Sequence, residues 1–199
     1  MTVTVDYFMT TSSPWSYLGA RRFMAMTEKV GAEVNVYAVD FGQIFSQSGG
    51  LPLPKRAPQR RAYRLVELAR WKRQLGLPIV IEPENFPART PLSAHLVTAA
   101  RLAGGDALTL STLILEALWE QDRSIDDDSV LVECCQKAGL DGVSLMQSAK
   151  SEETKAAFEE DTELALHRGV FGAPSFIIDE ELFWGQDRLD FVAEKLGAV

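Results

Sequence analysis

Apolar and polar residues alternate at the start of the chain, in the segment VTVDY that begins at Val3. A period of two is typical of a strand in a sheet, so we predict a strand over residues 3–9. The segment TTSSP then ends the strand, and Pro14 suits the first turn of a helix, where its missing N–H costs no hydrogen bond. We predict that this helix continues through Met26 and that a second strand follows over residues 33–39.

The composition changes after the second strand. Residues 41–58 contain Gly49, Gly50, Pro52 and Pro54, which is typical of a loop. We place a domain boundary in this segment.

A long helical block follows, from residue 59 to about residue 167. The first helix of this block is indicated by apolar residues with i, i+3, i+4 and i+7 spacing, namely Ala62, Leu65, Val66 and Ala69. Further helical patterns cover residues 92–102, 107–119, 129–138 and 151–166.

Strand character returns only near the C-terminus, at residues 175–178 and 182–184, with an acidic turn between them. A last helix is predicted over residues 187–196. The order β-α-β, helical block, β-β-α is that of an α/β thioredoxin-like fold with an all-helical insertion domain. We assign residues 1–42 and 168–199 to the thioredoxin-like domain and residues 43–167 to the helical insertion domain.

Charge and composition narrow the classes of function. A net charge of -8 disfavours a nucleic-acid partner, because phosphate binding requires a basic surface. The sequence has no secretory signal pattern and no apolar run long enough to span a membrane, so we expect a cytoplasmic protein with no membrane partner. Cys134 and Cys135 are adjacent, which suits neither a redox pair nor a zinc site, and we expect partly buried structural thiols and no metal.

The first candidate site is Ser13-Pro14-Trp15-Ser16, at a strand-to-helix turn. Thioredoxin-like oxidoreductases place C-x-x-C there, because the helix N-terminus stabilises a thiolate. With serine at both cysteine positions, dithiol exchange is excluded. The hydroxyl of Ser13 could instead donate a hydrogen bond to the thiolate of a bound cofactor and lower its pKa. The alternative is that Ser12 or Ser13 only caps the helix.

The second candidate site is Gly172-Ala173-Pro174-Ser175. If the Ala173–Pro174 bond is cis, the backbone of Ala173 can pair with an extended peptide such as glutathione. The alternative is a trans proline that begins an edge strand.

The third candidate site is Gly185-Gln186-Asp187, where the last helix is expected to begin. Backbone N–H groups there could hold the γ-glutamyl carboxylate of such a peptide, and Asp187 its ammonium group. Asp187 could also be an N-cap only.

A basic set, Lys55, Arg56, Arg60 and Arg61, lies in and after the Pro-rich loop, and one or two of its members could pair with carboxylates of glutathione or of an anionic substrate. The alternative is a solvated helix face. His95 is interpreted as a packed or half-exposed helical residue, and His167 as a residue that interacts with a helix C-terminus.

These residues together resemble the 2-hydroxychromene-2-carboxylate isomerase family, relatives of kappa-class glutathione transferases and of DsbA. The resemblance rests on DYFMTTSSPWSYLG, RAYRLVELARWKRQLGLPI, ALWEQDRSIDDDSVL and GVFGAPSFIIDEELFWGQDRL. It implies a homodimer that uses glutathione without consuming it, by thiolate addition, bond rotation and elimination. By position, Ser13 matches the serine that binds the sulfur, Ala173 and Pro174 the cis-proline pair, and Gln186 and Asp187 the γ-glutamyl site.

We therefore predict a glutathione-dependent cis-trans isomerase of an aromatic-derived unsaturated keto acid. Ser13 is the predicted catalytic residue, and Arg60 joins the predicted glutathione site. Trp15, Leu51 and Arg89 are assigned to the substrate pocket. The chain differs from the family at three places. Thr10 and Thr11 stand where relatives often have an aspartate before the serine, and Leu51 stands where they often have an asparagine after Gly-Gly. Arg89 stands where another asparagine is frequent, and these differences point to a different substrate. The alternatives are a kappa-like glutathione transferase and a non-catalytic thiol-peptide binding module.

Overall fold

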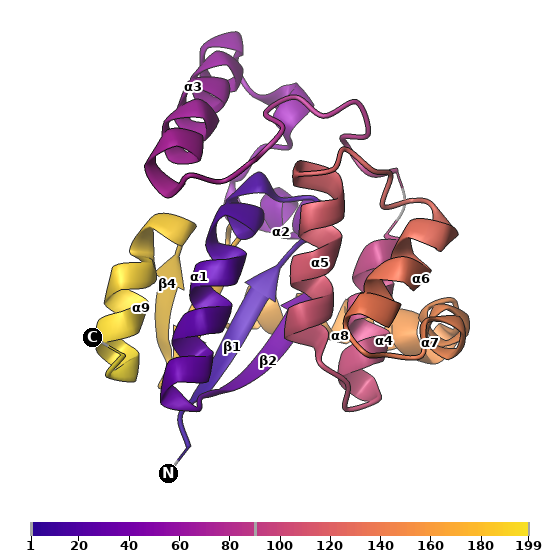
Figure 1. Ribbon diagram of the computed structural model, residues 1–199. Coiled ribbons are helices and arrows are strands. Elements are labelled where there is room, and N and C mark those ends of the chain that lie inside the picture. The colour runs from indigo at the N-terminus through magenta and orange to yellow at the C-terminus, as the bar shows by residue number, and fades with distance from the viewer. Residues whose placement is uncertain (1, 90, 199) are drawn as a thin grey trace.

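A four-stranded mixed sheet forms the centre of the molecule in the computed structural model, which describes residues 2–89 and 91–198. The strands are β1 (Thr4–Met9), β2 (Glu33–Ala38), β3 (Ser175–Ile178) and β4 (Glu181–Trp184), in the spatial order β2-β1-β3-β4. β1 is parallel to β2 and antiparallel to β3, and β3 forms a hairpin with β4. This arrangement confirms the predicted thioredoxin-like α/β fold (Figure 1).

Both faces of β1 are buried, and successive side chains enter different cores. Val5, Tyr7 and Met9 belong to one apolar cluster, whereas Phe8 belongs to the second. Because alternate residues of a strand point to opposite faces, a strand with helices on both sides needs apolar residues in both sets.

Helices cover both faces of the sheet. α1 (Pro14–Val30), α5 (Ala107–Trp119) and α9 (Leu189–Leu196) lie in front of it as drawn in Figure 1, while α8 (Glu152–His167) lies behind. α8 also contacts α2 (Phe41–Ser48), and α4 (Leu92–Leu102) packs against β2. The remaining short helices are α6 (Asp128–Lys137) and α7 (Gly142–Ala149), together with the 3-10 turns Leu53–Lys55 and Gln186–Arg188.

The helices of the predicted insertion share a core with the sheet. α4 and α8 contact β2, and α5 packs along α1. The division into residues 1–42 with 168–199 and residues 43–167 stays a prediction, but the sheet and these helices form continuous layers in Figure 1.

The helix α3 (Pro58–Leu75) stands apart from the other layers, above the start of α1 in Figure 1. Its buried residue is Leu68, whereas Ala62 and Val66, on the predicted apolar face, are exposed. The i, i+3, i+4, i+7 pattern identified the helix correctly, but only Leu65 and Ala69 of its four residues are partly buried, because α3 has only limited contact with the rest of the chain.

Three other predictions need correction. The segment predicted as a loop contains helix α2, in which Asp40 caps the N-terminus and Phe41 and Ile44 are buried. The helical block is interrupted over residues 76–89, where no regular element occurs. The last helix begins at Leu189, after a 3-10 turn, and not at residue 187.

Cys134 and Cys135 lie on α6 as free thiols, and both are buried more completely than predicted. In the described part of the chain, no helix combines the length and the apolar character that a membrane span requires.

Candidate active site

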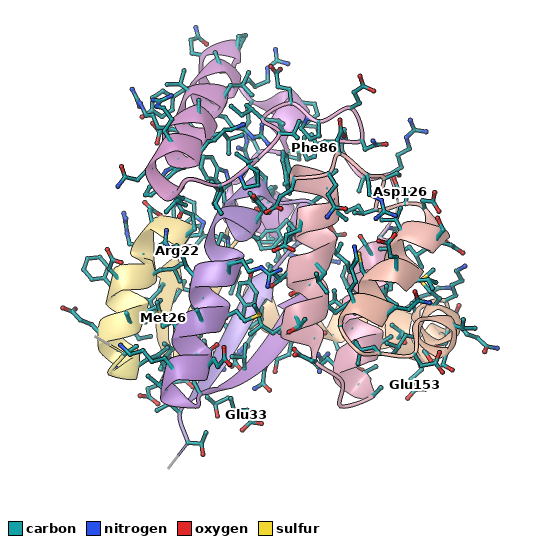
Figure 2. All side chains as sticks on the ribbon, viewed as in Figure 1. Arg22, Met26, Glu33, Phe86, Asp126 and Glu153 are labelled. Atoms are coloured by element: carbon teal, nitrogen blue, oxygen red, sulfur yellow. The ribbon has the colours of Figure 1, made fainter. Side chains whose placement is uncertain are left out.

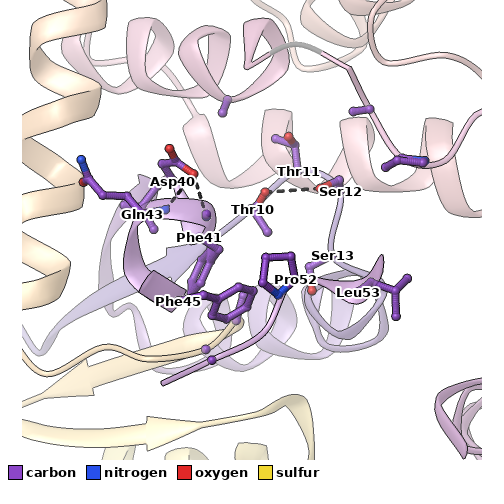
Figure 3. Close-up of a pocket in the computed structure, with 18 of the residues that line it drawn as sticks. Thr10, Thr11, Ser12, Ser13, Asp40, Phe41, Gln43, Phe45, Pro52 and Leu53 are labelled. Atoms are coloured by element: carbon purple, nitrogen blue, oxygen red, sulfur yellow. Dashed lines mark hydrogen bonds between the residues drawn. The ribbon is translucent and has the colours of Figure 1, made fainter. Parts of the chain in front are cut away.

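A cleft of about 1140 Å³ contains most of the residues singled out by the sequence. Its walls come from residues 10–15, from α2 and the loop that leads to α3, from the start of α3, from residues 86–89 and 91–95, from α8, and from residues 171–173 with Trp184. Figure 3 shows Ser13 close to Pro52, with Phe41 and Phe45 of α2 on the facing side. The strand end, the Pro-rich loop and the segment before β3 therefore meet at one place.

Ser13 is the N-cap of α1, as its position before Pro14 predicts. Its Oγ accepts a hydrogen bond from the backbone N–H of Ser16 at 3.1 Å, and its relative exposure is 8%. Within residues 2–89 and 91–198, its own O–H has no acceptor. The capping interpretation is thus confirmed, and the hydroxyl proton remains available to a ligand in the cleft.

The turn before Ser13 is tied to α4. The hydroxyls of Thr11 and Ser93 form a buried hydrogen bond of 2.8 Å. The backbone N–H of Ser13 donates to the carbonyl of Thr10 at 3.0 Å, which closes the turn. Figure 3 also shows the longer contact between the hydroxyls of Thr10 and Ser12. These bonds hold the Ser13 side chain in a fixed place on the cleft wall.

The Ala173–Pro174 peptide bond is cis, the first of the two alternatives that the sequence left open. The carbonyl of Pro174 accepts from the N–H of Gly185 at 2.9 Å, and the carbonyl of Gly172 accepts from Ser175 Oγ at 2.7 Å. By contrast, neither backbone group of Ala173 has a hydrogen-bond partner among the described residues. Ala173 lines the cleft, so its N–H and C=O are free to pair with an extended peptide.

Gln186 and Asp187 do not line the cleft as the structure describes it. Gln186 is 2% exposed, and its Oε1 and backbone carbonyl accept hydrogen bonds from Arg22 at 3.2 and 3.0 Å. Asp187 forms an ion pair of 2.8 Å with Arg188. Their assignment to the γ-glutamyl group stays a prediction.

The basic set divides in two. Lys55 and Arg61 are exposed outside the cleft, whereas Arg56 and Arg60 line it. Arg56 donates from Nε to the carbonyl of Leu51 at 2.7 Å and lies over the ring of Phe45. Burial, with a smaller effect of Arg60, lowers the pKa of Arg56. The cleft is cationic although the whole chain carries a net charge of -8.

The three residues predicted for the substrate pocket, Trp15, Leu51 and Arg89, all line the cleft. Leu51 is 48% exposed, and Trp15 is half-buried. Arg89 is exposed, and its backbone N–H donates to Asp126 at 2.7 Å. The substrate positions and the residues predicted to bind glutathione at Ser13, Ala173 and Arg60 therefore share one space.

Two cleft residues were not assigned to a site from the sequence. Arg64 lies one turn after Arg60 on α3, and the i, i+4 spacing from Arg60 to Arg64 is a signal that could have found it. His95 on α4 is half-buried, as expected, with its ring edge-on to Phe158 at 4.9 Å. Burial, and then Lys155, lowers the pKa of His95, while Glu159 opposes them.

Among the described residues, no group of three or more His, Cys, Asp or Glu side chains could hold a metal ion. Burial raises the pKa of both Cys134 and Cys135 to about 11, and neither lines the cleft. The cleft therefore offers hydroxyl, backbone, guanidinium, imidazole, ammonium and carboxylate groups, and no cysteine thiol lines it.

Comparison with known proteins adds a family match and several relatives. The family model described as a DSBA-like thioredoxin domain matches residues 4–197. A protein named 2-hydroxychromene-2-carboxylate isomerase from Sphingobium xenophagum is 27% identical over 98% of this chain and 99% of its own length. A protein of the same name from Pseudomonas putida is 25% identical over 98% of this chain and 95% of its own length.

Solved structures show the same fold. A structure of 2-hydroxychromene-2-carboxylate isomerase has a TM-score of 0.82 and 24% identity, and the match covers 98% of this chain and 94% of that one. The cytosolic disulfide reductase DsbM from Pseudomonas aeruginosa, solved with GSH, has a TM-score of 0.69 and 18% identity over 98% of this chain and 95% of that one.

Proposed function

Since the chain belongs to the family of DsbA-like thioredoxin domains, we propose that it is a member without dithiol chemistry that acts as a glutathione-dependent cis-trans isomerase of an unsaturated keto acid. The observation that carries the proposal is the free hydroxyl proton of Ser13, in a cleft that also contains the unpaired backbone of Ala173. In a dithiol oxidoreductase, the position of Ser13 would carry the reactive thiol. Here an external thiol must supply the sulfur.

The residues present fit glutathione as that thiol. Its peptide backbone can pair with the N–H and C=O of Ala173, and its carboxylates can meet Arg56 or Arg60. The Ser13 hydroxyl can donate to the sulfur while its oxygen accepts from Ser16. A hydrogen bond to the thiolate favours the ionised form and lowers the pKa of the thiol.

When bound, glutathione would supply a nucleophilic thiolate, which suits reversible addition to a conjugated double bond. The task of the chain is then to keep that thiolate ionised and to hold the substrate beside it. Trp15, Phe86 and Leu51 give the cleft an apolar surface for an aromatic-derived compound. The cationic residues suit an acid, and the names of the sequence relatives, at about a quarter identity, support an isomerase of a carboxylate.

The test is a turnover balance with 2-hydroxychromene-2-carboxylate, the compound in the relatives' names. We expect many product molecules for each glutathione added, and no decline in free glutathione. Consumption of one glutathione per product would assign a transferase instead. Calorimetry that detects no glutathione binding at millimolar concentration would refute both enzymes and leave a binding module for some other ligand.

A further inference from the structure

Arg64 is held in the cleft by two aromatic rings. Its guanidinium carbon lies 5.4 Å from the ring centre of Phe86 and 5.8 Å from that of Trp119. These two rings contact each other at 5.1 Å, and Trp119 is fully buried. Figure 2 places Phe86 between α3 and the nearby end of α5. Cation–π contacts and ring packing thus fix the position of the guanidinium group.

This cation lacks an anionic partner. Among the described residues Arg64 belongs to no ion pair, and its Nη2 atom is buried without a hydrogen-bond acceptor. The indole Nε1 of Trp119 is also a buried donor without an acceptor, although Trp119 does not line the cleft. The surroundings of Arg64 therefore contain more donors than acceptors, which is costly for buried groups unless a ligand satisfies them.

The charges near Arg64 lead to the same conclusion. Burial, and then the neighbouring Arg56, lowers the pKa of Arg64, and Glu82 opposes this effect only in part. A partly buried guanidinium within the electrostatic influence of another guanidinium gains strongly from a bound anion, and its planar pair of donors matches a carboxylate.

We infer that Arg64 binds the carboxylate of the substrate acid and makes the cleft selective for acids over neutral unsaturated compounds. This inference rests on the proposed function and adds a specificity residue to it. The substrate is favoured over glutathione as the source of this carboxylate because the surroundings of Arg64 are aromatic, whereas the unpaired peptide groups that suit glutathione belong to Ala173.

The experiment measures binding and needs no turnover. Cinnamate and cinnamamide are planar aromatic compounds that differ in the carboxylate, and their affinities are measured by calorimetry with wild type, Arg64→Gln and Arg64→Lys. We expect Arg64→Gln to weaken cinnamate binding about tenfold or more, as for a lost hydrogen bond to a charged group, and to change cinnamamide less than twofold. Arg64→Lys should retain part of the preference, because it keeps the charge and loses the planar fork.

The matched control is Arg61→Gln, which removes the same charge from an exposed position of the same helix. It should change neither affinity, and all variants should retain the wild-type circular dichroism spectrum. Equal affinity of the wild type for the two compounds, or equal losses for both in Arg64→Gln, would overturn the inference. If Arg64→Gln weakened only glutathione binding, the inference would also be overturned. The same holds if Arg89→Gln, and not Arg64→Gln, weakened cinnamate binding. A protein that binds cinnamate through Arg64 but fails the turnover balance keeps the inference and refutes the isomerase.

Discussion

The backbone N–H of Ser16 donates to Oγ of Ser13 at 3.1 Å, so one hydroxyl both caps α1 and faces the cleft. The oxygen is used by the helix, and the proton remains for a ligand. Capping and thiolate binding are therefore compatible, and they can be separated by experiment.

Ser13→Ala should affect both roles. We expect a loss of about 1 kcal/mol in the free energy of unfolding from the missing cap. We also expect at least a several-fold fall in kcat/KM, from a donor contribution of about 1–3 kcal/mol. Urea denaturation and steady-state kinetics on the same preparation measure the two effects.

Ser151→Ala is the matched control, because Ser151 caps α8 by accepting from the N–H of Thr154 at 3.2 Å and does not line the cleft. It should lower stability to a similar extent and leave kcat/KM unchanged. If Ser13→Ala behaves in the same way, Ser13 is only a cap.

Gly172→Ala should move one wall of the cleft. A Cβ atom at this position would lie 2.2 Å from Nε1 of Trp184, so the indole must shift. We expect altered tryptophan fluorescence and weaker glutathione binding, because Trp184 and the adjacent Ala173 both line the cleft. Adding Trp184→Leu removes the clash, and the double variant should bind glutathione as Trp184→Leu alone does. Wild-type fluorescence and affinity in Gly172→Ala would contradict the close approach of Gly172 to the Trp184 indole.

His95 should make stability depend on pH. Its pKa in the folded chain lies below its ordinary value of 6.5, because burial and Lys155 disfavour the charged form. Below pH 6.5 the unfolded chain therefore binds more protons at this residue, and its contribution to stability is lost as the pH falls through the folded-state pKa. Urea denaturation at pH 8 and pH 5 should show a smaller decrease for His95→Gln than for wild type. Equal decreases would mean that His95 titrates alike in both states.

Cys134 and Cys135 should be unreactive in the native protein. Burial raises both pKa values to about 11, so at pH 8 very little thiolate forms. We expect Ellman's reagent to detect no thiol before urea is added and two afterwards. One thiol that reacts rapidly without denaturant would contradict the assignment of both residues to the core.

The order of strands and helices was predictable because it depends on local periodicity and on turn residues such as Gly31, which ends α1 with a φ of 65°. Helix α2 was missed because its eight residues are flanked by glycines and prolines that are typical of loops. Its formation depends on the Asp40 cap and on burial of Phe41 and Ile44, and burial is a tertiary property.

The site was predictable where chemistry follows from neighbouring residues, as at Ser13 and Ala173. The i, i+4 spacing from Arg60 indicates that Arg64 shares its face of α3, whereas His95 reaches the cleft through the packing of α4, which sequence spacing does not specify. The contact of Gln186 with Arg22 joins residues far apart in the sequence, and no local pattern indicates it.

The pairing of β1 with β3 has a consequence for synthesis on the ribosome. Phe8 of β1 pairs with Ser175 of β3. Because β1 is synthesised long before β3, one edge of β1 stays unpaired until β3 has been made. A nascent chain, or a fragment that stops before Ser175, exposes that side as an open edge capable of pairing with other chains. Ser13 is synthesised long before Ala173. The ligand cleft can therefore be completed only when the segment with Ala173 and the β3–β4 hairpin has left the ribosome.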